Sequence, residues 1–460
     1  MKLSPWPLLL AAAVLTPLPA RTAAPTPPNI VLILADDLGY GDLGCYGQVR
    51  IPTPRIDRLA AEGMRFTQFY AGSTVCAPSR NVLMTGQHTG HVQVRGNAKV
   101  GLRPTDVTVA QILRQAGFAT ALAGKWGLGA EHSDAIPTRK GFDSFFGYLD
   151  QTHAHNYYPT FLLRDDRRVT LRNVVPDEGA FGQGVATVRL DYSDDLIVDE
   201  ALAVIDRQQT HPFFLYLAST LPHANDENKA NGMEVPDLGM FAHEPWPEPE
   251  KAFAAMVARL DRDVGRILDR LRERGLSDRT VVILASDNGP HAEGGQDPAF
   301  FHSAGPWRGL KRDLYEGGIR VPFIVRWPGQ VAPGSVSHQP GYLGDLMATF
   351  ADLAGAPAPA GLDSVSLLPA LQGRPLPSKA RDYFYWEFYE GASAQAVRFG
   401  DWKALRRPML TGPMELYDLA TDPGEQRNLA ADHAAVVAKA AKFMTEAHEP
   451  SPLWPVPKLP

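Results

Sequence analysis

Cysteine is scarce in this sequence, with only Cys45 and Cys76 among 460 residues. Export to an oxidising compartment would favour one disulfide between them. We favour a free Cys76, because it lies in a stretch whose chemistry needs a free group. Positive charge is not in excess either. The formal net charge is −6, which gives no general affinity for nucleic acid or anionic membranes. An anionic ligand would therefore need a local cluster of Lys and Arg.

Long apolar segments are also missing. The apolar run near the start, Leu8 to Leu15, is too short to span a bilayer and is followed by small residues and prolines. With Lys2 before it, this pattern predicts a secretory signal peptide over residues 1–24. We therefore expect an exported protein, periplasmic or secreted, that has no membrane attachment after cleavage.

Four segments share one pattern, an apolar run that ends in polar side chains. These endings are Asp36-Asp37, Lys125, His223 and Asp287-Asn288. Continuous apolar runs are typical of strands buried on both faces of a parallel sheet. Ligands bind beyond the carboxyl ends of the strands in open α/β sheets, so the four endings predict a single site.

Amphipathic helices separate these strands. The clearest spans 250–274, where apolar residues at spacings of three and four form one face, and a shorter one spans 108–116. Alternating strands and helices predict an α/β fold with a mostly parallel sheet. After residue 375, short aromatic strands and a final helix predict an antiparallel sheet. We therefore expect a catalytic domain over 25–375 and a smaller α+β subdomain over 376–460.

The two acidic strand ends offer hard oxygen ligands, which suit Ca²⁺ or Mg²⁺. They are Asp36, Asp37, Asp287 and Asn288. A single Asp-Asp pair would equally fit a turn or a helix cap. Two such pairs at equivalent strand ends favour a metal, because gathering these carboxylates without a cation is costly.

The stretch from Ser73 to Gly86 places Cys76 at the start of an expected helix. Pro78 fits the first turn of that helix. Arg80 follows Cys76 by four residues, so one turn brings its guanidinium beside the sulfur position. The free N–H groups of the first turn add positive potential. This combination suits chemistry on an anion.

Further cations could surround an anion bound on the metal. They are Lys125, Lys311 and His223. Positive groups placed where negative charge develops are the usual source of catalysis in phosphoryl and sulfuryl transfer. Each residue taken singly is more often a solvated or structural group.

These motifs resemble those of the type I sulfatase family, the formylglycine-dependent arylsulfatase-like enzymes of the alkaline phosphatase superfamily. Cys76-Ala-Pro-Ser-Arg80 followed by Thr85-Gly86 matches the signature C-x-P-S-R-x-x-x-x-T-G. The resemblance runs in order over nearly the whole mature chain. It includes Asp36-Asp37, Gly124-Lys-Trp-Gly-Leu-Gly129, Pro222-His223, Asp287-Asn-Gly289, Gly309-Leu-Lys311 and Glu316-Gly-Gly-Ile-Arg-Val-Pro322.

The resemblance implies an alkaline phosphatase-like sheet between helices and a specific chemistry. A formylglycine-generating maturation enzyme would oxidise Cys76 to formylglycine (3-oxoalanine), whose hydrate attacks the sulfur of a sulfated sugar or another sulfate ester. One Ca²⁺ would bind residue 76 together with Asp36, Asp37, Asp287 and Asn288. The implied roles of the remaining residues are holding of the formylglycine by Arg80, sulfate binding by Lys125 and Lys311, and protonation of the departing alcohol by His223.

One position departs from the family pattern. Many sulfatases have a histidine two residues after the lysine, where this chain has Gly127. His153 and His155 follow soon after and could replace it, and His155 is our candidate. His291 and His302 are candidates for substrate contacts. The loop aromatics Tyr157, Tyr158 and Trp246 could stack on a sugar, although loop aromatics are more often simply packed.

Two other functions stay open. Phosphonate monoester hydrolases share the formylglycine and metal logic, and alkaline phosphatases share the fold, although no extra His/Asp cluster suggests a zinc pair. An exported sulfoglycan-binding protein with a relic site is the second alternative. Gly127 favours the relic. The intact site residues oppose it: Cys76, Arg80, Lys125, His223 and Lys311.

Overall fold

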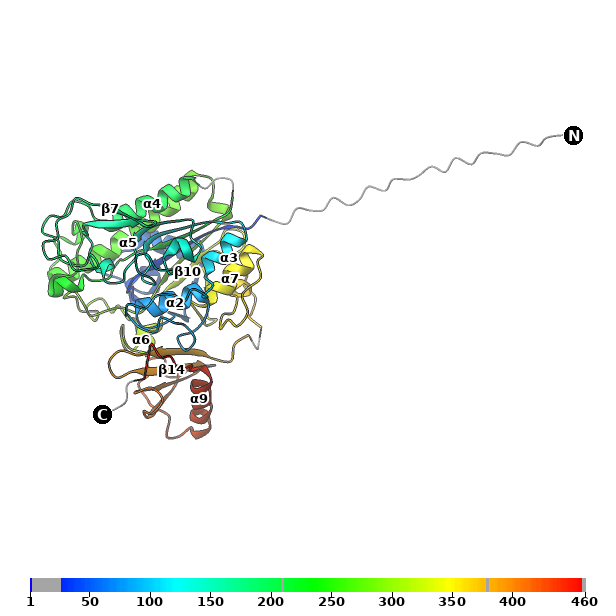
Figure 1. Ribbon diagram of the computed structural model, residues 1–460. Coiled ribbons are helices and arrows are strands. Elements are labelled where there is room, and N and C mark those ends of the chain that lie inside the picture. Colours follow the sequence, from blue (N-terminus) through cyan, green and yellow to red (C-terminus); the bar gives the residue numbers. More distant parts are fainter. Residues whose placement is uncertain (2–25, 208–210, 378–379, 457–460) are drawn as a thin grey trace.

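A computed structural model describes residues 1, 26–207, 211–377 and 380–456 of the protein. Figure 1 shows a large α/β unit and, at its lower end, a smaller unit of strands and one helix formed by the C-terminal part of the chain. Apart from Met1, the predicted signal peptide lies outside the described residues. Among the helices that are described, none combines the length and apolarity needed to cross a membrane.

A ten-stranded mixed sheet forms the centre of the large unit. In spatial order its strands are β11 (Ser335–Ser337), β2 (Met64–Phe66), β10 (Phe323–Arg326), β9 (Thr280–Ser286), β1 (Asn29–Ala35), β8 (Phe213–Ala218), β4 (Ala119–Lys125), β5 (Ser144–Tyr148), β6 (Phe161–Arg164) and β7 (Arg167–Thr170). The four predicted apolar runs are β9, β1, β8 and β4, which lie side by side and run parallel. Their carboxyl ends therefore share one edge of the sheet.

The sheet becomes antiparallel toward both sides. Strand β10 runs antiparallel to β9 and to β2, and the pairs β5–β6 and β6–β7 are antiparallel too. Two short strands, β3 (Phe69–Tyr70) and β12 (Gly341–Tyr342), pair separately. The predicted mixed, mostly parallel sheet is confirmed. At its centre the five neighbouring strands β9, β1, β8, β4 and β5 are all parallel.

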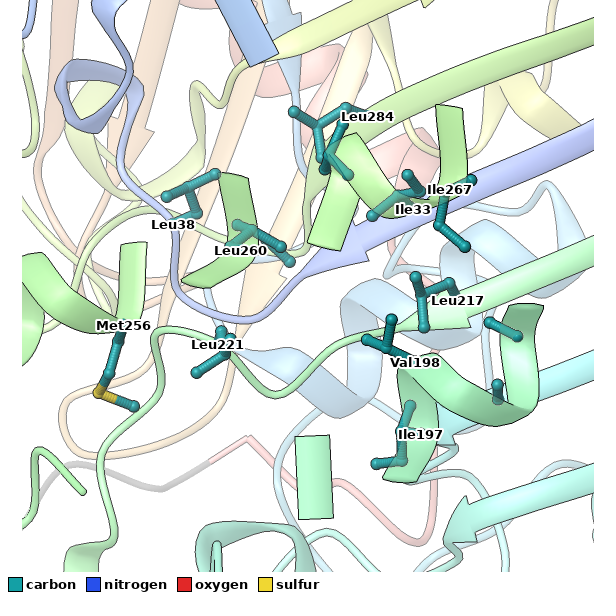
Figure 2. Packing of buried hydrophobic residues seen from close by; sticks show 14 of the residues in the cluster. Ile33, Leu38, Ile197, Val198, Leu217, Leu221, Met256, Leu260, Ile267 and Leu284 are labelled. Atoms are coloured by element: carbon teal, nitrogen blue, oxygen red, sulfur yellow. The ribbon is translucent and has the colours of Figure 1, made fainter. Parts of the chain in front are cut away.

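Alternate residues of β1 enter two different hydrophobic cores. Ile33 lies in one core with residues of α1 (Pro54–Ala61), α4 (Ser193–Arg207) and α5 (Glu248–Glu273), and Figure 2 shows Val198, Leu260 and Ile267 of the same core. Leu32 faces the other core, which is built with α2 (Cys76–Thr85), α3 (Val109–Gln115) and α7 (Asp345–Ala354). Burial on both faces is the reason that these strands are continuously apolar.

The C-terminal unit is an antiparallel sheet with one helix, as predicted. Its elements are β13 (Phe384–Phe388), β14 (Ala394–Phe399), β15 (Trp402–Arg406), β16 (Met414–Asp418) and α9 (Ala434–Ala447). One face packs on α9, with Val397 against Met444 in the same core. The other face packs on the large unit, where Trp386 shares a core with Val75 and Val82, which lie on either side of Cys76 in the chain.

Two short helices, α6 (Glu316–Ile319) and α8 (Leu368–Leu371), complete the large unit. Glu316 begins α6 and lies in a buried charged cluster that joins the two units. The Lys403 Nζ of β15 lies 2.9 Å from a carboxylate oxygen of Glu316 and 2.9 Å from one of Glu425. Tyr70 and Arg320 donate to the second Glu316 oxygen at 2.7 and 3.0 Å. All of these residues are at least nine-tenths buried.

Candidate active site

The carboxyl ends of the four central strands meet the first turn of α2. The Cys76 Sγ donates to Asp36 Oδ1 at 3.1 Å and lies 3.9 Å from Asp37 Oδ1. Cys76 is the first residue of α2, preceded by the extended Val75, and both cysteines are free thiols. The disulfide alternative is therefore excluded in this structure. Burial beside Asp287 and Asp36 raises the pKa of the Cys76 thiol well above its usual value.

Helix α2 presents Arg80 one turn after Cys76, as its spacing predicts. Arg80 Nε and Nη2 donate to Asp287 Oδ2 at 3.0 and 2.8 Å, and Nη1 donates to the Lys125 carbonyl at 2.8 Å. The helix ends at Gly86, whose φ of 68° is the left-handed conformation that favours glycine. Arg80 thus ties α2 to the ends of β9 and β4.

Two lysines reach the same carboxylates from opposite directions. Lys125, at the end of β4, donates to Asp36 Oδ2 at 2.5 Å. Lys311 donates to Asp37 Oδ2 at 2.8 Å and to a Glu293 oxygen at 2.9 Å. Ten residues were predicted for the site, and nine of them converge here, each more than nine-tenths buried. They are Asp36, Asp37, Cys76, Arg80, Lys125, His223, Asp287, Asn288 and Lys311, and the tenth is His155.

The acidic residues fit a hard cation. Burial and the neighbouring Asp36 raise the pKa of Asp287 to about 7 despite its contact with Arg80. Burial opposes charge on Asp36 as well, but Lys125, His223 and Arg80 hold its pKa well below the usual value. Asn288 donates from Nδ2 to Asp37 at 2.6 Å, while its buried Oδ1 has no hydrogen-bond partner among the described residues. Crowded carboxylates and an unpartnered amide oxygen are what a bound Ca²⁺ would satisfy.

His223 follows β8 and faces the lysines. Its Nδ1 donates to the Ala224 carbonyl at 2.6 Å, which leaves Nε2 toward Lys311 Nζ at 3.3 Å. Burial, and next the Lys311 charge, lower the pKa of His223 well below its usual value. His155 stacks on this ring, with centroids 4.9 Å apart and an interplanar angle of 18°. His155 therefore contacts the site indirectly, by stacking on His223.

Most of the other histidines and aromatic residues singled out in the sequence do not join the buried cluster. His153 lies between Tyr148 and Phe161, and burial lowers its pKa to about 4, so it is not a candidate for the missing histidine. Tyr157 and Tyr158 are buried, which leaves no face for a sugar. Trp246 packs on Phe241, Phe300 and Phe301, and His302 is exposed. His291 is buried, with Nε2 3.2 Å from the Pro222 carbonyl.

Two residues at the site were not predicted. Glu293 contacts Lys311 and Arg312, and Lys311 lowers its pKa to about 2 although burial opposes this. Its place two residues after His291, in a loop next to the metal pair, is the only sequence signal. Gln151 lies over Gly127, the position where the family histidine is missing. Gly127 was the sequence signal, because the absent side chain leaves space that Gln151 occupies.

Comparisons with known proteins agree with this geometry. The Sulfatase family model matches residues 28–356, and the model for the C-terminal part of N-sulphoglucosamine sulphohydrolase matches residues 308–449. Human arylsulfatase A is 34% identical, covering 93% of this chain and 87% of its own. Pig N-acetylgalactosamine-6-sulfatase is 35% identical, covering 83% and 72%.

A solved structure extends the similarity to three dimensions. The crystal structure of Ps i-CgsB in complex with k-i-k-neocarrahexaose superposes with a TM-score of 0.79 at 28% identity, covering 94% of this chain and 95% of that one. The similarity thus includes both the large unit and the C-terminal sheet. A family model that matches most of the chain, together with relatives above 30% identity, shows that this chain belongs to the sulfatase family and is a sulfate ester hydrolase.

Proposed function

We propose that this sulfatase removes sulfate from a sulfated carbohydrate, using a formylglycine made from Cys76 and one Ca²⁺ bound by Asp36, Asp37, Asp287 and Asn288. The observation that carries the proposal is the buried convergence of Cys76 with three carboxylates and three fixed cations. Buried, fixed cations beside a nucleophile position suit transfer of a sulfuryl group, whose oxygens carry negative charge.

Each resident group has a separate task in this proposal. The bound Ca²⁺ would neutralise the carboxylates and polarise a sulfate oxygen, and the hydrated aldehyde would supply an oxygen nucleophile. Arg80 keeps the side chain of residue 76 in place through its hold on Asp287 and the β4 backbone. Lys125 and Lys311 bind the sulfate oxygens and stabilise the charge that develops on them.

We assign the proton for the departing alcohol to the pair formed by His223 and Lys311. Their nitrogens lie 3.3 Å apart, and the His223 Nδ1–H is fixed on a carbonyl, so Nε2 faces Lys311. Positioned acids of this kind contribute about 10²–10⁴-fold to rate. Glu293 holds Lys311 from the side opposite Asp37.

The substrate class is a carbohydrate sulfate in this proposal. The names of two relatives refer to an aminosugar sulfate and to a neocarrahexaose. Next to the buried site, the partly exposed ion pairs Lys99–Asp150 and Arg312–Glu293 offer donors and acceptors for sugar hydroxyl groups. We further propose export after cleavage of residues 1–24, maturation by a formylglycine-generating enzyme, and the division into domains over 25–375 and 376–460.

Parallel assays on an aryl sulfate and an aryl phosphate test the reaction class. We expect kcat/KM for the sulfate to exceed that for the phosphate. The site offers ligands for one metal ion and a few fixed cations, which suit the single negative charge of a sulfate ester better than the higher charge of a phosphate ester. A preference for the phosphate or a phosphonate would instead support the related hydrolases on this scaffold. Sulfated mono- and oligosaccharides, assayed next by release of inorganic sulfate, test the carbohydrate assignment.

Removal of calcium should lower the thermal stability of the protein. Without a cation the three buried carboxylates repel one another, and a ligand at about 1,000 times its Kd stabilises the folded state by roughly 4 kcal/mol. We expect the melting temperature to fall after dialysis against a chelator and to recover with Ca²⁺ in differential scanning calorimetry. The Asp36→Asn variant should respond much less to Ca²⁺. An equal response to Ca²⁺ in both proteins would place the ion elsewhere.

Replacing His155 with Ala should slow turnover more than it weakens substrate binding. His155 supports the His223 ring, and groups that orient an active-site ligand are typically worth about 10–100-fold in activity. We expect kcat to fall with little change in KM. The His153→Phe variant is the matched control, because His153 packs among aromatic rings and should leave kcat unchanged. Wild-type turnover in His155→Ala would contradict the role.

A further inference from the structure

The space of the missing family histidine is filled by a side chain from the turn that follows the neighbouring strand, β5. Gly127 has a φ of 72°, and a Cβ atom added there would lie 2.5 Å from Gln151 Oε1 and 3.9 Å from Arg80 Cδ. The backbones are in register, because the N–H of Gly127 donates to the Leu149 carbonyl at 3.1 Å. Gln151 therefore reaches over Gly127 toward the base of Arg80, next to the candidate active site.

The turn that carries Gln151 is fixed by hydrogen bonds. Asp150 accepts from the backbone N–H groups of Thr152 and His153 at 2.8 and 3.2 Å, and Lys99 donates to both of its oxygens. A short helical turn over residues 153–155 follows directly. The position of Gln151 is thus set by its neighbours rather than by bonds of its own amide.

Both polar atoms of the Gln151 side chain are buried, and neither has a hydrogen-bond partner among the residues that the structure describes. An unpaired buried donor or acceptor is destabilising, so native structures rarely keep one without another purpose. Here the unpaired amide lies over Gly127, two residues after Lys125 and next to the Arg80 side chain, at the edge of the buried cluster of fixed cations. Nearby carboxylates are engaged by those cations.

We propose that the Gln151 amide binds the sulfate group of the substrate, donating from Nε2 to a sulfate oxygen. The inference rests on the proposed sulfatase function and names a residue of that site. Its Oε1 is left to accept from a hydroxyl group next to the sulfate. An amide neither gains nor loses a proton in the physiological range. Gln151 therefore orients the bound group and does not take over proton transfer from the histidine that the family often has at Gly127.

Binding of inorganic sulfate to the calcium-loaded protein tests this role by isothermal titration calorimetry. Gln151→Glu keeps the shape but replaces the donor with an anion, and we expect Kd for sulfate to rise at least about 10-fold. Gln151→Ala should also raise Kd, by a smaller factor. It should not lower the melting temperature, because it removes an unpaired buried amide. Gln330→Glu, an exposed residue, controls for the added charge and should bind sulfate as the wild type does.

The outcomes separate the two proposals. A Gln151→Glu variant that is folded and binds sulfate as tightly as Gln330→Glu overturns the role of Gln151, provided that the wild type hydrolyses an aryl sulfate. A large fall in melting temperature for Gln151→Ala, with unchanged Kd, would show a structural role and overturn it as well. A wild-type protein that neither binds sulfate nor hydrolyses aryl sulfate overturns the proposed function itself.

Discussion

The Cys76→Ala variant should lose sulfatase activity almost completely, with a fall in kcat on the order of 10⁶-fold, as for other enzymes that lose their nucleophile. In the proposed chemistry residue 76 supplies the attacking oxygen, and no other side chain in the buried site is placed to do so. Arg80, Lys125 and Lys311 would still bind sulfate, so affinity for inorganic sulfate should survive. The activity is measured as kcat on an aryl sulfate.

Mass spectrometry of the peptide that carries residue 76 completes this test. In active wild-type protein we expect a mass below that of the cysteine peptide, because the thiol has become an aldehyde. Cys45→Ala is the matched control and should retain activity, since Cys45 lies outside the cluster and contacts Asp57 rather than the site carboxylates. A fully active enzyme with unmodified cysteine at position 76 would refute the formylglycine assignment.

The Lys403→Met variant should be strongly destabilised. Lys403 lies between two buried glutamates, and removing one partner of a buried ion pair typically costs about 3–5 kcal/mol. Burial opposes charge on Glu316, but Lys403 and Arg320 lower its pKa to about 2. Burial raises the pKa of Glu425 to about 7 in spite of Lys403. We therefore expect a lower free energy of unfolding in urea at neutral pH.

The loss should depend on pH with a definite sign. Glu316 has a depressed pKa, so its contribution is present above about pH 4.5 and disappears as pH falls toward 2. Glu425 has a raised pKa, so its charged form becomes costly as pH rises from 4.5 through 7. Without Lys403 both carboxylates prefer protons, and the deficit should be larger at pH 8 than at pH 5.

Lys442→Met gives the matched control for this substitution. Lys442 pairs with Glu446 on the exposed side of α9, and such surface pairs are worth about 0–1 kcal/mol. Equal stability of the Lys403→Met and Lys442→Met proteins at pH 8 would show that the buried cluster does not hold the two units together.

Much of the site could be predicted because its residues lie at or just after the carboxyl ends of parallel strands. Asp36 and Asp287 come directly after an apolar strand, Lys125 ends one, and His223 follows β8 by five residues. Parallel strands bring such endings to one edge. The core of the fold and the cluster of charged residues could therefore be anticipated together.

The parts that could not be predicted depend on side-chain direction and on contacts across the chain. His153 and His155 are two residues apart in one short turn, yet one ring packs on Tyr148 and the other on His223. Nothing in the spacing decides which ring faces the site. Gln151 fills the space over Gly127 only because β4 and β5 are paired, which is a tertiary fact rather than a local pattern.

The cluster around Lys403 also has a consequence for the order of events during synthesis. Glu316 lies five residues after Lys311 and pairs locally with Arg320, but its second cation, Lys403, comes from β15, which leaves the ribosome much later. The apolar side chains of Val75 and Val82 are likewise covered only after Trp386 of β13 has been synthesised. The large unit can form its sheet early in synthesis. The segments next to the candidate active site complete their packing only after β13 and β15 have been synthesised. Premature termination would therefore leave a chain with a formed core and an unfinished catalytic wall.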